Sequence, residues 1–189
     1  MIRVEKTAIT TGISKSARLL KDNHTNGLIL DYGCGKLRNT KYLLDSKFKI
    51  YIHDTDLQLD NIKENIPEEV SVLKNETNFD SILCSFVLNV IPSINERISL
   101  IHNIEKLLSE NGYVYFEVRK PDFINKSKTA RTYNDGYILG STKFKTFQKA
   151  YDKKELSQFI IDNSSLKIEN LIDQPNSIIA ICTKKSDSI

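Results

Sequence analysis

Residues 28–44 read LILDYGCGKLRNTKYLL, an apolar run that leads into two glycines and then into an amphipathic segment. The pattern predicts a buried strand over Gly27–Asp31, a sharp turn at Gly33 and Gly35, and a helix over Asn39–Asp45. Glycines at such a junction remove side chains where the chain turns, so backbone amides can face a ligand near the start of the helix. This stretch therefore predicts a ligand site at the carboxyl end of the first strand.

The rest of the chain alternates strand patterns with helix patterns. Further strands are expected at Phe48–Ile52, Val70–Leu73, Asp80–Phe86, Tyr113–Val118, Leu166–Ile172 and Ile178–Thr183. Helices are expected at Ser14–Leu20, 57–67, Ile94–Leu108 and Lys153–Asp162. The helix at Ile94–Leu108 is expected to stop at the glycine of SENG, residues 109–112, and the turn signal DQPN, residues 173–176, joins the last two strands into a hairpin. We therefore predict an α/β fold: a Rossmann-like, seven-stranded, mostly parallel sheet with a C-terminal antiparallel hairpin and helices on both faces.

Length and composition fit one folded domain, since the chain has 189 residues, of which 40% are hydrophobic and 27% are charged. We expect a single domain over 1–189, with a helical lead-in at 1–26 and a substrate-side insertion at 120–150. No apolar run approaches the roughly 18 residues that span a bilayer, and the first residues lack the apolar core of a signal peptide. We therefore expect a cytoplasmic protein without membrane contact.

The chain has three cysteines, Cys34, Cys84 and Cys182. They are an odd number and lack metal-ligand spacing, so we expect neither a disulfide framework nor a metal site.

Two acids follow the first two predicted strands. Asp31 stands just before the glycine turn, where it can orient the loop or face a cationic ligand group. Asp54 lies 23 positions further on, at the end of the second strand, where an acid in such folds meets the hydroxyls of a ribose. A carboxylate can accept hydrogen bonds from both hydroxyls at once. The alternative, that Asp31, Asp54 and Asp56 only cap turns and helix starts, stays open.

Two other nucleotide motifs fit this stretch poorly. A dinucleotide-binding fingerprint has a third glycine where this chain has Arg38, which argues against NAD. A phosphate-binding loop of the ATPase type has a lysine followed by serine or threonine, and Lys36 is followed by Leu37.

Taken together, the motifs LILDYGCGK, YIHDTD, FDSILCSFVLNVIP and NGYVYFEV resemble the successive motifs of class I S-adenosylmethionine-dependent methyltransferases. The resemblance covers nearly the whole chain and implies S-adenosylmethionine as cofactor. It implies that the glycine turn holds the methionine part, that the acid after the second strand holds the ribose, that residues after the third strand touch adenine, and that the end of the fourth strand borders the methyl donor. Carried over by position, the cofactor residues are Asp31, Gly33 and Gly35, then Asp54, then Asn75 or Glu76, then Cys84, Ser85 and Phe86. Leu37 departs from the family pattern, because many members have a small residue there.

A narrower resemblance is carried by KTAITTGISKSARLL near the start and STKFKTFQKAYDKKEL near the end. Both are similar to the methyltransferase domain of DNA phosphorothioation-associated methyltransferases, which are longer chains. This resemblance implies an association with nucleic-acid or phage-defence systems.

The positive charge of the chain is concentrated in one segment. Residues 120–154 hold eight lysines and one arginine against three aspartates, a net charge of +6, while the rest of the chain carries −3. Basic groups with interleaved aromatic rings can hold phosphates and stack bases, so a nucleic acid bound through Lys143, Lys145 and Lys149 is one candidate acceptor, and an anionic small molecule is another. The alternative is a solvated lysine face whose aromatic residues pack onto the sheet.

The sequence does not name a catalytic residue. The end of the fourth strand lacks the Asp/Asn-Pro-Pro-aromatic motif of enzymes that methylate amino groups of DNA, and Cys84 lacks a neighbouring proline and is interpreted as a buried strand residue. His53 is the histidine nearest to the predicted site, but a sulfonium donor needs no base when the acceptor is already nucleophilic. We predict an S-adenosylmethionine-dependent methyltransferase of undetermined acceptor and oligomeric state, with a catalytically silent binding module for nucleic acid or a protein as the alternative.

Overall fold

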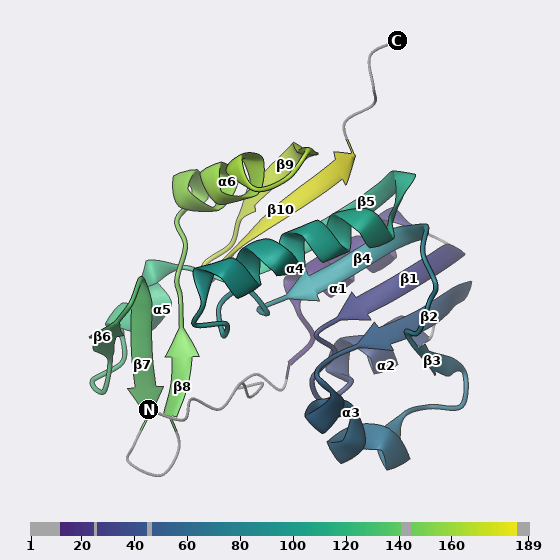
Figure 1. Ribbon diagram of the computed structural model, residues 1–189, viewed down its shortest axis with the longest axis horizontal. Coiled ribbons are helices and arrows are strands. Elements are labelled where there is room, and N and C mark those ends of the chain that lie inside the picture. Colours follow the sequence, from purple (N-terminus) through teal and green to yellow (C-terminus); the bar gives the residue numbers. More distant parts are fainter. Residues whose placement is uncertain (1–11, 25, 45–46, 141–144, 185–189) are drawn as a thin grey trace.

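The central element of the structure, a computed structural model, is a seven-stranded sheet (Figure 1). The structure describes residues 12–24, 26–44, 47–140 and 145–184. The strand order is β3-β2-β1-β4-β5-β10-β9; β1 to β5 are parallel, and β10 runs antiparallel to both of its neighbours. The strands are β1 (Asn26–Tyr32), β2 (Lys47–His53), β3 (Val70–Val72), β4 (Phe79–Ser85), β5 (Leu108–Arg119), β9 (Leu166–Asp173) and β10 (Ser177–Lys184). The predicted fold class and the C-terminal hairpin are therefore confirmed.

Helices cover both faces of this sheet. One face carries α1 (Lys15–Asn23), α2 (Arg38–Leu44) and α3 (Asp56–Ile62), which a short 3-10 turn, η1 (Lys63–Asn65), extends; the other carries α4 (Ile94–Leu107) and α6 (Lys153–Asp162). Side-chain oxygens cap four helix starts by accepting hydrogen bonds from backbone amides, and these caps are Ser14, Thr55, Ser93 and Asp152. In the part of the chain that the structure describes, we find no helix with the length and apolar character needed to cross a bilayer.

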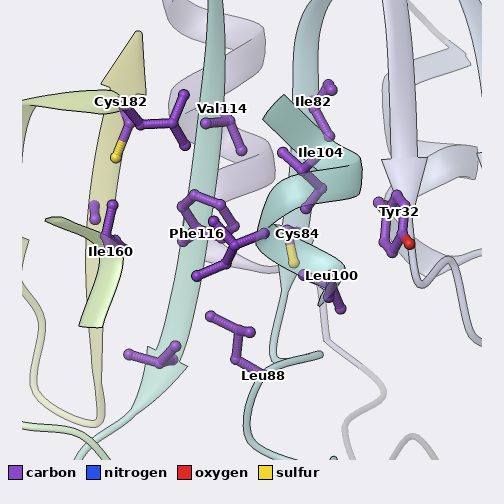
Figure 2. Packing of buried hydrophobic residues seen from close by; sticks show 14 of the residues in the cluster. Tyr32, Ile82, Cys84, Leu88, Leu100, Ile104, Val114, Phe116, Ile160 and Cys182 are labelled. Carbon is purple, nitrogen blue, oxygen red and sulfur yellow. The ribbon is translucent and has the colours of Figure 1, made fainter. Parts of the chain in front are cut away.

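The core lies in two layers, because alternate residues of each central strand point to opposite faces. Figure 2 shows Leu100 and Ile104 of α4 packed toward Cys84 and Phe116 on one face of the sheet. On the other face, side chains of α1, α2 and α3 pack on the intervening strand residues, among them Leu83 and Tyr115. Both faces of the sheet are therefore covered by helices, whereas loops follow the carboxyl ends of its parallel strands.

The predicted glycine stop after the helix at Ile94–Leu108 is wrong. α4 ends at Leu107, and β5 begins at the next residue, so SENG lies inside a strand. Phe79 pairs with Leu108 while Ser81 pairs with Tyr113, so the four residues between form an irregularity in the β4–β5 pairing. Gly112 is needed there for space, since a Cβ atom at this position would lie 2.7 Å from the carbonyl oxygen of Phe79.

Much of the predicted substrate-side insertion is an ordered substructure. It contains α5 (Pro121–Asn125) and a small antiparallel sheet of β6 (Arg131–Tyr133), β7 (Gly136–Gly140) and β8 (Lys145–Gln148). Asn89 links this part to the large sheet: its side chain accepts a hydrogen bond from the amide of Arg119 (3.1 Å) and donates one to the carbonyl of Lys149. The amide of Lys149 in turn donates to the carbonyl of Asn89 (2.7 Å).

A buried arginine provides a second link between the two sheets. Arg97 of α4 is 1% exposed, and its Nη2 donates to both carboxylate oxygens of Asp135, at 2.7 and 2.6 Å. Its Nη1 donates to the hydroxyl of Tyr151 at 2.9 Å. A buried guanidinium needs such partners, because an unpaired buried charge is strongly destabilising.

Replacing Asp135 with alanine should lower the free energy of unfolding by about 1 to 3 kcal/mol, because two charge-assisted hydrogen bonds to Arg97 are lost. Urea unfolding measures this change. Asp60→Ala on exposed α3 is the control, expected to change stability by less than about 0.5 kcal/mol. Equal effects of the two substitutions would show that the Arg97 ion pair does not stabilise the fold.

Candidate functional site

A cavity of about 440 Å³ opens at the carboxyl ends of β1, β2 and β4. This volume lies within the range of small-molecule sites. Its walls come from the turn after β1, the end of β2, the starts of α2 and α3, the loop after β4 and one side of α4. Arg119 at the end of β5 and Gln148 of the small sheet complete them. The predicted ligand crevice therefore exists at the predicted edge of the sheet.

The glycine turn is tied to the end of β2 by backbone hydrogen bonds. The amides of Gly33 and Cys34 donate to the carbonyl of His53, at 2.7 and 3.1 Å. Gly33 and Gly35 have φ angles of 78° and 55°, in the left-handed region that favours glycine. Leu37 also has a left-handed φ, of 62°, and its side chain is buried in the core. The chain thus has a left-handed backbone at Leu37, and the Leu37 side chain contributes to packing.

Asp54 joins β2 to the turn through its side chain. One carboxylate oxygen accepts from the amide of Gly35 and the other from the amide of Thr55, both at 2.8 Å. Gln58 completes the link by donating to the carbonyl of Gly35 at 2.7 Å. Each carboxylate oxygen can accept a second hydrogen bond, so Asp54, which lines the cavity, can still receive two hydroxyls.

The structure brings five of the eight predicted cofactor residues to the cavity wall: Gly33, Gly35, Asp54, Ser85 and Phe86. Three lie outside the wall, namely Asp31, Asn75 and Cys84. Asn75 is exposed in the turn after β3. The backbone amides of Lys74 and Asn75 donate to the carboxylate of Glu76. Cys84 is buried in the core under α4, and burial raises the pKa of its thiol well above the usual value.

Asp31 lies on the α2 side of the sheet. It is 1% exposed, and its carboxylate accepts a hydrogen bond from the hydroxyl of Thr40 at 2.7 Å. Burial raises the pKa of Asp31 to about 6, against the lowering effects of the Thr40 hydrogen bond and the charge of Arg38. The Asp31 side chain therefore links the end of β1, just before the glycine turn, to helix α2.

Sequence reasoning missed one wall of the cavity, the polar side of α4. Asn95, Ser99 and Asn103 are spaced by four residues and therefore lie on one side of the helix, where they line the cavity. Their spacing was visible in the sequence, but a polar side of an amphipathic helix is ordinarily interpreted as solvent-facing. The rings of Tyr32 and His53, which also line the cavity, lie 4.5 Å apart between centroids.

His53 is the only histidine on the cavity wall among the described residues. Burial lowers the pKa of its ring, although the charges of Asp54 and Asp56 act to raise it. The ring is therefore neutral at neutral pH and can accept or donate a hydrogen bond.

Two arginines and an aromatic ring form the wall near β4 and β5. Phe86 follows β4 with a φ angle of 62°, and its amide donates to the carbonyl of Glu117 at 2.7 Å. The guanidinium carbons of Arg38 and Arg119 lie 5.7 and 4.4 Å from the centroid of the Phe86 ring. All three residues line the cavity. Strained backbone of this kind at a non-glycine residue is often found at functional sites.

A buried carboxylate lies beside this wall. Glu117, 1% exposed, accepts hydrogen bonds from the amide and hydroxyl of Ser16, at 2.9 and 2.7 Å, and from the hydroxyl of Ser177 at 2.7 Å. Ser16 also shares a hydrogen bond of 2.6 Å with Ser85, a cavity residue. These contacts hold the start of α1 and the start of β10 against the end of β5.

A family model described as a methyltransferase domain matches residues 8–158. The chain belongs to this methyltransferase domain family. It is 27% identical over 148 residues to an uncharacterized protein, YmfD, of Escherichia coli strain K12, an alignment that covers 68% of this chain and 67% of that protein. The sequence-based resemblance to methyltransferases is therefore confirmed.

Solved structures with the same fold include two methyltransferases. The CcbJ methyltransferase from Streptomyces caelestis has a TM-score of 0.70 at 13% identity, covering 90% of this chain and 88% of its own. The 1,6-didemethyltoxoflavin-N1-methyltransferase from Burkholderia thailandensis has a TM-score of 0.64 at 16% identity, covering 90% and 76%; it was crystallised with 1,6-didemethyltoxoflavin and S-adenosylhomocysteine.

The basic segment of this methyltransferase domain is partly neutralised by neighbouring acids. Lys149 is paired with Glu155, and Lys120 donates to Asp173 at 2.7 Å. Lys143, one of the three lysines predicted to hold a nucleic acid, lies outside the described residues. The candidate nucleic-acid surface therefore stays a prediction.

The raised pKa of Asp31 predicts a pH-dependent contribution to stability. The folded state holds the proton up to about pH 6 and the unfolded chain only to about pH 3.8, so the contribution is full below pH 3.8 and is lost as the pH rises through 6. Asp31→Asn removes this titration, so its free energy of unfolding relative to wild type should rise by up to about 3 kcal/mol between pH 4 and pH 7. Urea unfolding at several pH values measures the difference, with Asp60→Asn as an exposed control. A difference that does not change with pH would contradict a titrating Asp31.

Proposed function

We propose that this domain transfers a methyl group from S-adenosylmethionine to an acceptor bound beside Phe86. The observation that carries the proposal is the junction of the glycine turn with Asp54: left-handed glycines and an acid from the next strand meet on one cavity wall. Membership of the methyltransferase family and the resemblance of the motifs to class I enzymes support it.

The described residues offer a place for each part of the cofactor. Asp54 would accept hydrogen bonds from the ribose hydroxyls, and the turn at Gly33 and Gly35 would leave room for the methionine part. The rings of Tyr32 and His53, together with the polar side of α4, would supply stacking and hydrogen bonds to adenine. The methyl group would then point toward the end of β4.

When bound, the cofactor would supply a methyl group attached to a cationic sulfur. A lone pair of the acceptor would bond to the methyl carbon as the carbon–sulfur bond breaks and the sulfur leaves as a neutral thioether. The protein's part in this step is to hold the acceptor in line with that bond and to exclude water. Ser85 and Phe86 would border this place, and neutral His53, which also lines the cavity, is a group able to take a proton. Titration calorimetry with S-adenosylmethionine, followed by assay of radiolabelled methyl transfer to candidate acceptors, tests the proposal. Cofactor binding with no transfer to any acceptor would favour a silent binding module.

Asp54→Asn should weaken the binding of S-adenosylhomocysteine by roughly ten- to a hundredfold, because a neutral amide replaces the charged acceptor of the ribose hydroxyls. The carbonyl oxygen of the introduced amide can still accept from the Gly35 backbone N–H, so the turn should persist. Calorimetry measures the affinity, and Asp56→Asn, exposed at the start of α3, is the matched control. Comparable losses in the two variants would remove Asp54 from the ribose site.

Gly33→Ala should also weaken the binding of S-adenosylhomocysteine, by roughly tenfold or more. An added Cβ atom would lie 2.3 Å from a methyl carbon of Val87, so the Val87 side chain must shift within the cavity. The double variant Gly33→Ala with Val87→Ala removes this clash and should recover part of the affinity. Wild-type affinity in a folded Gly33→Ala variant would show that the cofactor does not approach the turn.

A further inference from the structure

Arg38 and Arg119 bring two positive charges to one wall of the cavity. Both guanidinium groups lie over the same Phe86 ring, so their central carbons are at most about 10 Å apart. Arg119 is only 8% exposed and Arg38 is half-buried. The two residues come from different elements, the start of α2 and the end of β5.

Placing two like charges together in a recess is unfavourable unless something offsets their repulsion. Burial lowers the pKa of both groups, and the charge of Arg38 lowers that of Arg119 further. The Phe86 ring and the nearby Glu117 carboxylate offset part of this cost. An anion bound between the arginines would offset more, and a guanidinium has a planar set of donors that matches carboxylate and phosphate oxygens.

This wall is separated from the proposed ribose site. Asp54 follows β2, whereas Phe86 follows β4 and Arg119 ends β5, which is three strands away in the order β2-β1-β4-β5. With strands about 4.8 Å apart, that places the two ends of the site roughly 14 Å from one another. A cofactor that starts at Asp54 and crosses the glycine turn would therefore present its methyl group toward the arginines.

We propose that the acceptor is a small organic molecule carrying a carboxylate or phosphate group, which Arg38 and Arg119 bind while its nucleophilic atom faces the methyl donor. This proposal rests on the proposed methyltransferase function. A small molecule fits better than a polynucleotide, because the arginines line a cavity of only about 440 Å³ and Lys149, on the predicted nucleic-acid surface, is already paired with Glu155. Gln148, 2% exposed and on the same cavity wall, would add a hydrogen-bonding amide beside the anion.

The test measures binding of small probes to the protein saturated with S-adenosylhomocysteine. Benzoate and phenyl phosphate carry the two anionic groups, and benzamide is a neutral counterpart of benzoate. We expect at least one anion to bind roughly tenfold or more tightly than benzamide, and the tighter of the two identifies the anionic group of the acceptor. Arg119→Gln and Arg38→Gln should each lower the affinity for that anion by roughly ten- to a hundredfold. The affinity for S-adenosylhomocysteine should change by less than about threefold.

Arg131→Gln is the matched control, because Arg131 is exposed on β6 and lies away from the cavity wall. Circular dichroism and S-adenosylhomocysteine binding verify that each variant is folded. If Arg119→Gln does not fold, the half-exposed Arg38→Gln decides the question.

Three results would overturn the proposal, and each has a distinct signature. Equal binding of benzamide and the anions would show that the wall does not select charge. Loss of S-adenosylhomocysteine affinity in both arginine variants, with unchanged affinity for 5′-methylthioadenosine, would assign the arginines to the cofactor carboxylate. Tight binding of a single-stranded oligonucleotide that Lys145→Gln weakens and Arg119→Gln does not would favour a nucleic-acid acceptor. If S-adenosylhomocysteine itself fails to bind wild type, the proposed methyltransferase function fails first.

Discussion

The carbonyl oxygen of His53 accepts hydrogen bonds from the amides of both Gly33 and Cys34, and this contact fixes the turn after β1 on the end of β2. Buried backbone amides need acceptors, and for Gly33 and Cys34 the acceptor comes from the neighbouring strand. With the turn held there, the Gly35 amide reaches the carboxylate of Asp54. The cavity wall that would receive a cofactor is therefore built by backbone pairing between neighbouring parallel strands.

A second constraint acts at the other side of the cavity. Burying the Glu117 carboxylate would cost several kcal/mol without partners, and the hydrogen bonds from Ser16 and Ser177 provide them. Satisfying this one group draws the start of α1 and the start of β10 to the end of β5. The same convergence places Arg38, which follows the glycine turn and donates to the carbonyl of Gly12, near Arg119.

The small sheet completes the site. Chain between β5 and α6 leaves the large sheet, forms three short strands and returns at Lys149, where Asn89 binds it from the loop after β4. This return places Gln148 on the cavity wall beside residues that are far away in sequence. A region that lies outside the main sheet thus contributes to the acceptor end, while the cofactor end is built from the ends of β1 and β2 with side chains of α3 and α4.

Features that depend on near neighbours were determined by the sequence itself. The glycine turn, the helix at Lys153–Asp162, the helix expected at Ser14–Leu20 and the C-terminal hairpin all follow from spacing over a few residues, and the structure confirms each of them. The parallel arrangement of the first five strands followed from their alternation with helices.

Features that depend on packing between distant segments were decided only by the tertiary structure. Asp31 supports the turn from the α2 side because Thr40 meets it there, and SENG became part of β5 because Phe79 pairs with Leu108. Arg38 and Arg119 both contact the ring of Phe86, and these three residues come from different parts of the chain. No local sequence pattern encodes contacts between such distant residues. Which side chains a residue at the end of a strand contacts depends on how the whole sheet packs with its helices and loops.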